Sequence, residues 1–265
     1  MPADPAVKRS TIENLKVEVY PNARAAGEAA AQAAANELRN LDRSSETIGA
    51  IFATGASQLE MLHALVSAPG LPWAKMNGFH LDEYVGLSED HPASFRNYLR
   101  KNLTRKVAMR KFLEIDGTAA DLDRVCSDYA SALEAAKPQL CLLGIGENGH
   151  LAFNDPGEAD FNDPLDVKVV NLDRACREQQ AAEGWFESSD DVPTKAITLT
   201  IPALLRVPRL LVSVPGIRKA KIVQRSLFES ISPDCPATLL RTHPNATLYL
   251  DQESAAELNG ALAIR

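Results

Sequence analysis

Residues 139–150 read Gln-Leu-Cys-Leu-Leu-Gly-Ile-Gly-Glu-Asn-Gly-His, an apolar run that passes directly into a glycine-rich loop. An apolar run of this length without polar alternation is typical of a strand buried on both faces of a parallel sheet. The loop continues to Pro164 and is rich in Gly, Asn, Asp and Pro, which favour turns. The stretch therefore predicts a central buried strand whose carboxyl end opens into a long loop.

Strand-like and helix-like segments alternate on both sides of this stretch. We expect helices at residues 22–41, 57–66, 92–103, 119–136, 173–185, 217–229 and 252–262. We expect further strands at residues 47–53, 76–81, 112–115, 167–170, 196–199, 209–214 and 246–250. This alternation predicts an α/β protein, a three-layer α/β/α sandwich with a mostly parallel, Rossmann-like sheet. The sequence shows no linker, so residues 1–265 are expected to form one domain, with 155–192 suited to form a lid.

The composition argues against several classes of protein. The 265 residues are 45% hydrophobic and 24% charged, as in ordinary globular chains, and 28 Lys plus Arg against 35 Asp plus Glu give a net charge of −7. The acidic balance argues against a nucleic-acid partner, and no apolar run approaches the ~20 residues of a membrane span. The first ten residues lack the apolar core of a signal peptide, and the four cysteines form no C-x-x-C pair. The sequence therefore predicts a cytoplasmic protein with reduced thiols.

Three loops that follow expected strands hold the candidate site residues, because ligands of open parallel sheets bind beyond the carboxyl ends of the strands. The first loop, Thr54-Gly55-Ala56-Ser57, joins a strand to a helix. Gly55 allows a close backbone approach, the helix start offers N–H groups to an anion, and Ser57 begins a capping-box pattern with Glu60. The alternative is an ordinary strand-to-helix turn with a serine cap. The spacing excludes a nucleotide P-loop.

The second loop contains two adjacent carboxylates, Asp82 and Glu83. Neighbouring residues of a strand point to opposite faces, so at most one of the two side chains faces a cleft. A carboxylate with a raised pKa at this place is suited to act as a general base. A metal site of His80 with Asp82 and a solvated Asp-Glu turn are the alternatives.

The third loop follows the apolar strand at residues 140–143. Gly144, Gly146 and Gly149 spell G-x-G-x-x-G, but no long helix follows them, so the dinucleotide-binding interpretation fails on its context. The loop is expected to bring three polar side chains to one place, namely Asn148, His150 and Asp155. His150 is then an active-site histidine with partners for its ring nitrogens, or a structural one.

Together these segments resemble the glucosamine-6-phosphate deaminase (isomerase) family. The matching runs are residues 53–57 (Ala-Thr-Gly-Ala-Ser), 81–87 (Leu-Asp-Glu-Tyr-Val-Gly-Leu) and 144–157 (Gly-Ile-Gly-Glu-Asn-Gly-His-Leu-Ala-Phe-Asn-Asp-Pro-Gly), with weaker matches at Lys219 and residues 242–245. The resemblance implies a cytoplasmic conversion of glucosamine 6-phosphate to fructose 6-phosphate and ammonia that uses no metal and no cofactor. The implied partner is a small sugar phosphate. Members under allosteric control are oligomers, and the sequence shows no clear match to their second, allosteric site. A homo-oligomer is one expectation.

The resemblance also assigns roles to single residues. Asp82 matches the base that takes the C2 proton of the substrate. His150 matches the acid/base that opens the sugar ring, assisted by Asn148 and Asp155. The phosphate-binding positions match Thr54, Gly55, Ala56, Ser57 and Lys219.

Three positions depart from the usual pattern of the family. Many members have Asp in place of Asn148, Glu in place of Asp155, and a phosphate-clamping Arg near Ala182. Arg177 and Arg218 are candidates to replace that Arg. The departures leave two other functions open, a lactone hydrolase like the related 6-phosphogluconolactonases and a non-catalytic sugar-phosphate sensor. Glucosamine and galactosamine 6-phosphate both remain open as substrates.

Overall fold

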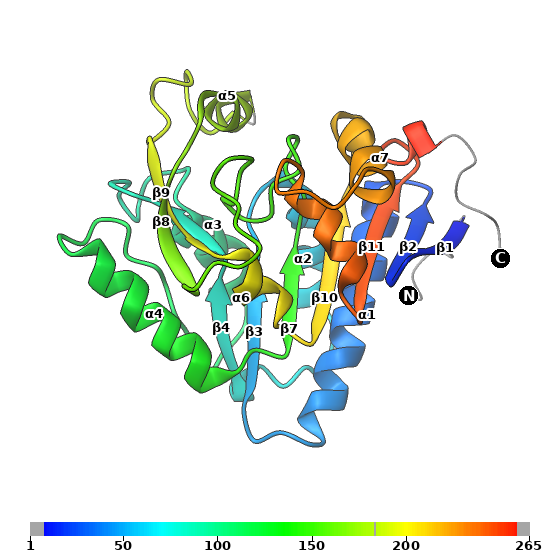
Figure 1. The fold of residues 1–265 in the computed structure, drawn as a ribbon. Helices are drawn as coiled ribbons and strands as arrows, with labels where there is room; N and C mark the ends of the chain where they lie inside the picture. The colour runs from blue at the N-terminus through cyan, green and yellow to red at the C-terminus, as the bar shows by residue number, and fades with distance from the viewer. Residues whose placement is uncertain (1–7, 183, 259–265) are drawn as a thin grey trace.

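A central sheet of eight strands organises the computed structural model, which describes residues 8–182 and 184–258 (Figure 1). In order across the sheet the strands are β1 (Lys8–Ile12), β2 (Leu15–Tyr20), β11 (Ala246–Asp251), β10 (Arg209–Val214), β7 (Leu140–Leu143), β3 (Ile48–Phe52), β4 (Met76–His80) and β6 (Lys111–Phe112). Neighbouring strands pair in parallel, except that β1 pairs antiparallel with β2 at one edge. The predicted mostly parallel sheet is confirmed.

Helices cover both faces of this sheet, because alternate residues of its strands are buried on opposite sides. In β7, Leu140 and Leu142 pack with one helical layer, whereas Cys141 and Leu143 pack with the other. The first layer contains α1 (Ala23–Asp42), α2 (Leu59–Val66) and α3 (Phe95–Leu99). The second contains α4 (Leu122–Ala136), α6 (Ile201–Leu205) and α7 (Ala220–Phe228). The three-layer α/β/α architecture is therefore confirmed.

The strand order reverses between β3 and β7. From β3 the chain proceeds outward through β4 to β6, then returns to place β7 on the other side of β3 and continues outward through β10 and β11. At such a reversal the connecting segments diverge to opposite faces, which leaves a crevice at the carboxyl ends of the strands. The first and third candidate loops follow β3 and β7, so the topology brings them to this crevice.

A second, smaller sheet lies beside the main one. It joins β5 (Asp82–Tyr84), β9 (Lys195–Leu199) and β8 (Val167–Asn171), all antiparallel. The strands expected at residues 167–170 and 196–199 exist, but their inclusion in the main sheet is wrong. Helix α5 (Arg174–Ala182) follows β8 and lies above the carboxyl ends of the main strands in Figure 1.

Several expected helix boundaries also differ. The helix expected at residues 92–103 begins only after Ser94, whose side chain accepts a hydrogen bond from the N–H of Asn97, and it ends in a wider turn at Arg100–Thr104. The helix expected at residues 252–262 is a set of turns up to a 3-10 turn at Ala256–Leu258, and its last positions lie outside the described residues. Strands β1 and β2 and helix α6 were not expected.

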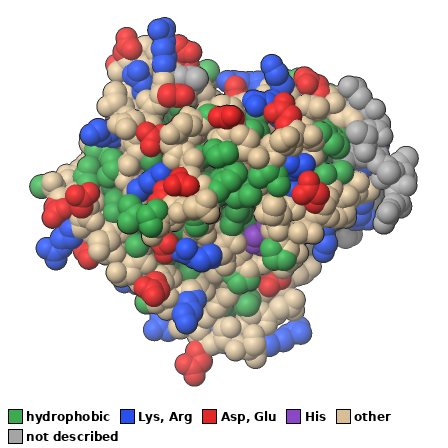
Figure 2. Space-filling model, viewed as in Figure 1, with side chains coloured by type: hydrophobic (Ala, Val, Ile, Leu, Met, Phe, Trp, Pro, Cys, Tyr) green, Lys and Arg blue, Asp and Glu red, His purple; other side chains and the backbone are tan. Residues whose placement is uncertain are grey.

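Charged side chains of both signs are interspersed over the face shown in Figure 2, with apolar side chains between them. None of the helices within residues 8–182 and 184–258 combines the length and the apolar character that crossing a membrane requires.

Candidate active site

A cavity of about 490 Å³ lies at the carboxyl ends of the central strands. Its walls come from the turns after β3 and β10, from β5, and from the loop after β7. Of the catalytic and phosphate-binding residues assigned from the sequence, those that line it are Thr54, Gly55, Ala56, Ser57, Asp82, His150 and Lys219. Asn148 and Asp155 do not line the cavity and lie behind His150, with which both form contacts.

Two equivalent turns face each other across β7. Gly55 after β3 has φ 98° and ψ 164°, and Gly216 after β10 has φ 95° and ψ 150°. Each glycine begins a 3-10 turn, Ala56–Gln58 or Ile217–Lys219, that leads directly into a helix. Such positive φ angles favour glycine, and helix starts present N–H groups that suit an anion. The cavity is therefore flanked by two turns of the same backbone conformation.

The prediction of a capping box from Ser57 to Glu60 is wrong. Ser57 lies inside the 3-10 turn, and no side-chain cap bonds the start of α2. The Ser57 hydroxyl instead accepts a hydrogen bond of 2.9 Å from Nε2 of Gln58. Because Gly55 places the chain in a 3-10 turn first, the α-helix begins two residues beyond Ser57.

Asp82 is a buried carboxylate at the start of β5, with only 7% of its surface exposed. Burial raises its pKa well above the ordinary value, and the nearby charges of Glu83 and Asp155 raise it further. A carboxylate with a raised pKa holds a proton more strongly than an ordinary Asp and is suited to proton transfer.

Glu83 points away from the cavity, as expected for the neighbour of Asp82 on a strand. Its carboxylate accepts hydrogen bonds from the Ser94 hydroxyl (2.9 Å), from the backbone N–H of Phe95 (3.1 Å) and Arg96 (2.9 Å), and from Nε of Arg96 (3.3 Å). Glu83 therefore anchors the start of α3 and supports β5 from behind.

The metal site of His80 with Asp82 is not supported. His80 is fully buried, and its Nε2 accepts a hydrogen bond of 2.8 Å from the backbone N–H of Ile115. Burial lowers its pKa to about 3, so the ring stays neutral. His80 is therefore a structural histidine that fixes the end of β4.

His150 forms a hydrogen-bonded group with the two residues behind it. Its Nδ1 lies 2.7 Å from Oδ1 of Asp155, which also accepts a hydrogen bond of 2.8 Å from the Asn148 amide. Asn148 in turn accepts a bond of 3.1 Å from the backbone N–H of His150. Burial disfavours the charged form of Asp155, but its interactions with His150 and Asn148 outweigh this effect and lower its pKa. The negative carboxylate thus orients the His150 ring and leaves Nε2 for a ligand.

The His150 ring lies directly on Gly146. A Cβ atom built on Gly146 would come closer than 2.5 Å to three ring atoms of His150, so only glycine fits beneath the ring. Two residues beyond His150, Ala152 has φ 53°, a conformation that costs energy for a residue with a side chain. The backbone of the loop after β7 therefore leaves space for the imidazole at Gly146 and adopts a costly conformation at Ala152, close to His150.

Cys176 on α5 brings a thiol to the same group. Its sulfur, a His150 ring nitrogen and an Asp155 oxygen lie within 4.8 Å of one another, close enough to be considered as three metal ligands. However, the 2.7 Å between His150 and Asp155 is a hydrogen-bond length, whereas two ligands of a tetrahedral zinc ion stand about 3.3 Å apart. The pKa of the thiol is raised by burial, by the charge of Asp155 and by its hydrogen bond to Asp155. The geometry thus favours a protonated, hydrogen-bonded cluster.

Three residues that connect the loops around the cavity were missed from the sequence. Thr198 on β9 pairs with Asp82 in the small sheet, and its hydroxyl accepts a bond of 3.1 Å from the N–H of Phe153 in the His150 loop. On α5, the side-chain oxygen of Gln179 accepts a bond of 3.0 Å from the N–H of Glu147, and that of Gln180 accepts a bond of 2.8 Å from the Tyr84 hydroxyl. Both glutamines line the cavity. The polar character of the predicted helix 173–185 is the only signal that pointed to them.

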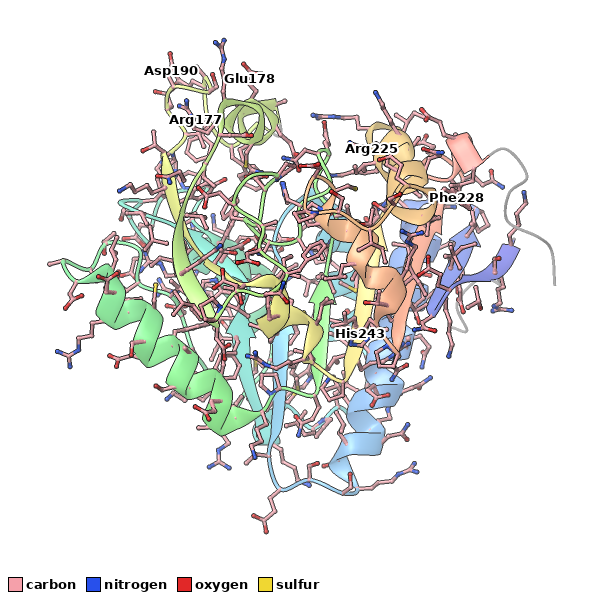
Figure 3. All side chains as sticks on the ribbon, in the orientation of Figure 1. Arg177, Glu178, Asp190, Arg225, Phe228 and His243 are labelled. Atoms are coloured by element: carbon pink, nitrogen blue, oxygen red, sulfur yellow. The ribbon has the colours of Figure 1, made fainter. Side chains whose placement is uncertain are left out.

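Of the two arginines considered as replacements near Ala182, only Arg218 lines the cavity. Arg177 donates a hydrogen bond of 3.2 Å to the carbonyl of Ser189 and lies at the outer end of the molecule with Glu178 and Asp190 (Figure 3). Lys219, which follows Arg218, donates a bond of 2.9 Å to the carbonyl of Ile145.

Comparisons with known proteins identify the family of the chain. The family model described as glucosamine-6-phosphate isomerases/6-phosphogluconolactonase matches residues 21–249. Glucosamine-6-phosphate deaminase of Bacillus cereus (strain B4264) is 36% identical over 212 residues, which are 80% of this chain and 79% of the relative. The corresponding protein of Bacillus thuringiensis (strain Al Hakam) is 35% identical over the same shares.

Solved structures show the same fold. A monomeric glucosamine-6-phosphate deaminase superposes with a TM-score of 0.82 at 29% identity and covers 91% of this chain and 99% of its own. A 6-phosphogluconolactonase from Thermotoga maritima superposes with a TM-score of 0.72 at 17% identity over 89% and 99% of the two chains, which is a likeness of fold alone. The chain therefore belongs to the glucosamine-6-phosphate isomerase/6-phosphogluconolactonase family.

Proposed function

We propose that the protein is a glucosamine-6-phosphate deaminase, which converts glucosamine 6-phosphate and water into fructose 6-phosphate and ammonia. The observation that carries the proposal is that Asp82 and His150 line the same cavity as the two glycine-led turns. The reaction needs a base for carbon-bound protons, an acid/base for the ring oxygen and an anion site, and this cavity offers groups suited to each. The names of the relatives that are 35–36% identical support the same reaction.

The phosphate binds at the first turn. Thr54, Gly55, Ala56 and Ser57 supply backbone N–H groups and hydroxyls, and Lys219 supplies a positive charge from the second turn. The Tyr98 hydroxyl donates a bond of 2.8 Å to the carbonyl of Gly55 and holds the first turn in place. This end of the cavity positions the sugar, so that its reacting carbons lie beside the two titratable groups.

His150 opens the sugar ring. It takes the proton of the C1 hydroxyl at Nε2 and returns a proton to the ring oxygen, which breaks the C1–O5 bond and gives the open-chain aldehyde. Asp155 and Asn148 act as positioning residues, because they touch His150 and do not line the cavity. A negative Asp155 also stabilises the imidazolium that forms between the two proton transfers.

Asp82 then moves a proton from C2 to C1. It takes the C2 proton, the C–H electrons form the C1–C2 double bond, and the carbonyl π electrons move to the C1 oxygen, which takes the proton that the C2 ammonium group releases. Asp82 next returns its proton to C1, which leaves an imine at C2. Water adds to the imine and ammonia leaves, giving the C2 ketone. These steps are proton transfers and a hydrolysis that side chains can perform, and we propose that no cofactor takes part.

The test is ammonia release from glucosamine 6-phosphate by the purified protein, with galactosamine 6-phosphate in parallel. Asp82→Asn should keep ligand affinity and lose turnover by about 10²-fold or more, together with the exchange of the C2 proton with solvent. Unchanged turnover in Asp82→Asn would refute the role of Asp82. Binding of hexosamine phosphates with no turnover in the wild-type protein would instead favour a sensor, and hydrolysis of 6-phosphogluconolactone would favour a lactonase.

We further propose a single cytoplasmic domain in which residues 155–192 form a lid, because α5 from this segment supplies Gln179 and Gln180 to the cavity wall. A homo-oligomer is also part of the proposal, and light scattering of the purified protein tests it.

A further inference from the structure

We infer that Arg218 is the second cation of the phosphate subsite and that Glu147 holds it in place until the phosphate arrives. The inference rests on the proposed function, since it assumes a sugar phosphate as the ligand. It assigns to Arg218, and not to Arg177, the role of the phosphate-clamping Arg that the sequence lacks near Ala182, and it gives Glu147 a role that the sequence did not indicate.

The charges around the cavity point to Arg218. Within the described part of the chain, the Lys and Arg side chains that line the cavity are Arg218 and Lys219, whereas four carboxylates line it, those of Asp82, Glu147, Asp251 and Glu253. A sugar phosphate carries between one and two negative charges near neutral pH. The single positive charge of Lys219, beside four carboxylates, does not compensate the negative charge of such a ligand. The guanidinium of Arg218 is therefore needed as a second positive charge.

The position of Arg218 in its turn supports the same role. Counting from the glycine with positive φ that begins each turn, Arg218 is the second residue after Gly216, and Ser57 is the second residue after Gly55. The two turns have the same backbone form and lie on either side of the loop after β7. Arg218 is therefore the counterpart of Ser57, which is one of the proposed phosphate ligands.

Glu147 forms an ion pair with Arg218 when no ligand is bound. Nη2 of Arg218 lies 2.8 Å from Oε1 of Glu147, and the two side chains are 52% and 31% exposed. An exposed ion pair of this kind contributes little to stability, because water screens both charges. A phosphate can accept two parallel bonds from one guanidinium, so it is a better partner for Arg218 than one oxygen of Glu147.

The experiment combines phosphate titration with steady-state kinetics on the full chain. Arg218→Ala should weaken binding of inorganic phosphate and raise KM for glucosamine 6-phosphate, each by about tenfold, with kcat within twofold of the wild type. Arg218→Lys should give an intermediate loss, because an ammonium keeps the charge but not the paired bonds. Glu147→Gln should act in the opposite direction and tighten phosphate binding about threefold, because it removes the competitor.

Arg225→Ala is the matched control. Arg225 lies on α7, pairs with Glu229 at 2.9 Å and does not line the cavity (Figure 3). It should leave both the phosphate affinity and KM unchanged. Wild-type affinity in Arg218→Ala, weaker binding in Glu147→Gln, or no phosphate binding by the wild-type protein would each overturn the inference. Because phosphate binding is measured without turnover, loss of binding in Arg218→Ala would support the subsite even if the deaminase reaction were refuted.

Discussion

Gly146→Ala should damage catalysis while leaving ligand binding and the fold nearly intact. The new methyl group would come closer than 2.5 Å to Cε1, Nε2 and Nδ1 of His150, whereas ordinary contacts begin at 3.4 Å. The ring must therefore move by about 1 Å, and such a shift of a catalytic group costs about 10²-fold in rate. The displaced ring would also lose its 2.7 Å contact with Asp155, which fixes its orientation. We expect kcat for ammonia release to fall by about 10²-fold.

The ring stands at the cavity, where it can swing aside without breaking the core, so the melting temperature should fall by no more than a few degrees. Binding of inorganic phosphate should change less than twofold, because the methyl group points at His150 and not at the turns. Leu165→Ala is the matched control, since it changes a side chain in the same segment between β7 and β8 that is 55% exposed and does not line the cavity. Its kcat should stay within threefold of the wild type. A similar kcat for Gly146→Ala would show that the close packing of Gly146 against His150 has no catalytic consequence.

Three further predictions concern buried carboxylates. Asp155→Asn should lower kcat by about 10²-fold in a coupled ammonia assay with KM nearly unchanged, because it removes the charge that orients His150, and a large change in KM would contradict this reasoning. Glu83→Gln should lower the free energy of unfolding by about 3 kcal/mol in urea titrations, because it removes the buried carboxylate that pairs with Arg96 and leaves the 55% exposed Asp116 as the carboxylate partner. A loss below about 1 kcal/mol would show that Asp116 alone satisfies Arg96. Asp82→Asn should stabilise the protein at pH 8 but not at pH 3. Because folding raises the pKa of Asp82, the wild type loses stability as pH rises through the pKa of the folded state. Below the pKa of the unfolded state, Asp82 is protonated in both states and the substitution removes no charge. Equal stability of Asp82→Asn and wild type across this range of pH in thermal unfolding would refute the raised pKa.

The fold was largely predictable because its central strands are apolar on both faces. β3 and β7 are fully buried, and a continuous apolar run is the direct sequence consequence. β2 was missed although its Leu15-Lys-Val-Glu-Val alternates as an amphipathic strand should. The small sheet could not be predicted, because Asp82 pairs with Thr198 across a long stretch of chain and neither local sequence records its partner.

The candidate site was predictable as far as the loop motifs reach. The turn at residues 54–57, Asp82 and His150 were placed near one another because each follows a strand of a parallel sheet. The sequence could not show that Asp155 lies behind His150 and outside the cavity. This position depends on the orientation of the His150 ring, whose Nδ1 faces Asp155. Gln179 was missed because its role depends on how α5 lies against the loop after β7, which its own sequence does not fix.

The reversal of strand order between β3 and β7 has a consequence for how the protein folds. These neighbours are distant in sequence: the backbone N–H of Gly49 donates to the side chain of Gln139, 90 residues further on. Contacts between such distant segments form late in folding because closing a long loop costs entropy. The two sides of the cavity therefore come together only when the chain is nearly native, and no fragment that ends before β7 should bind phosphate. A ligand that contacts both the loop after β3 and the loop after β7 would then stabilise the whole fold and slow its global unfolding.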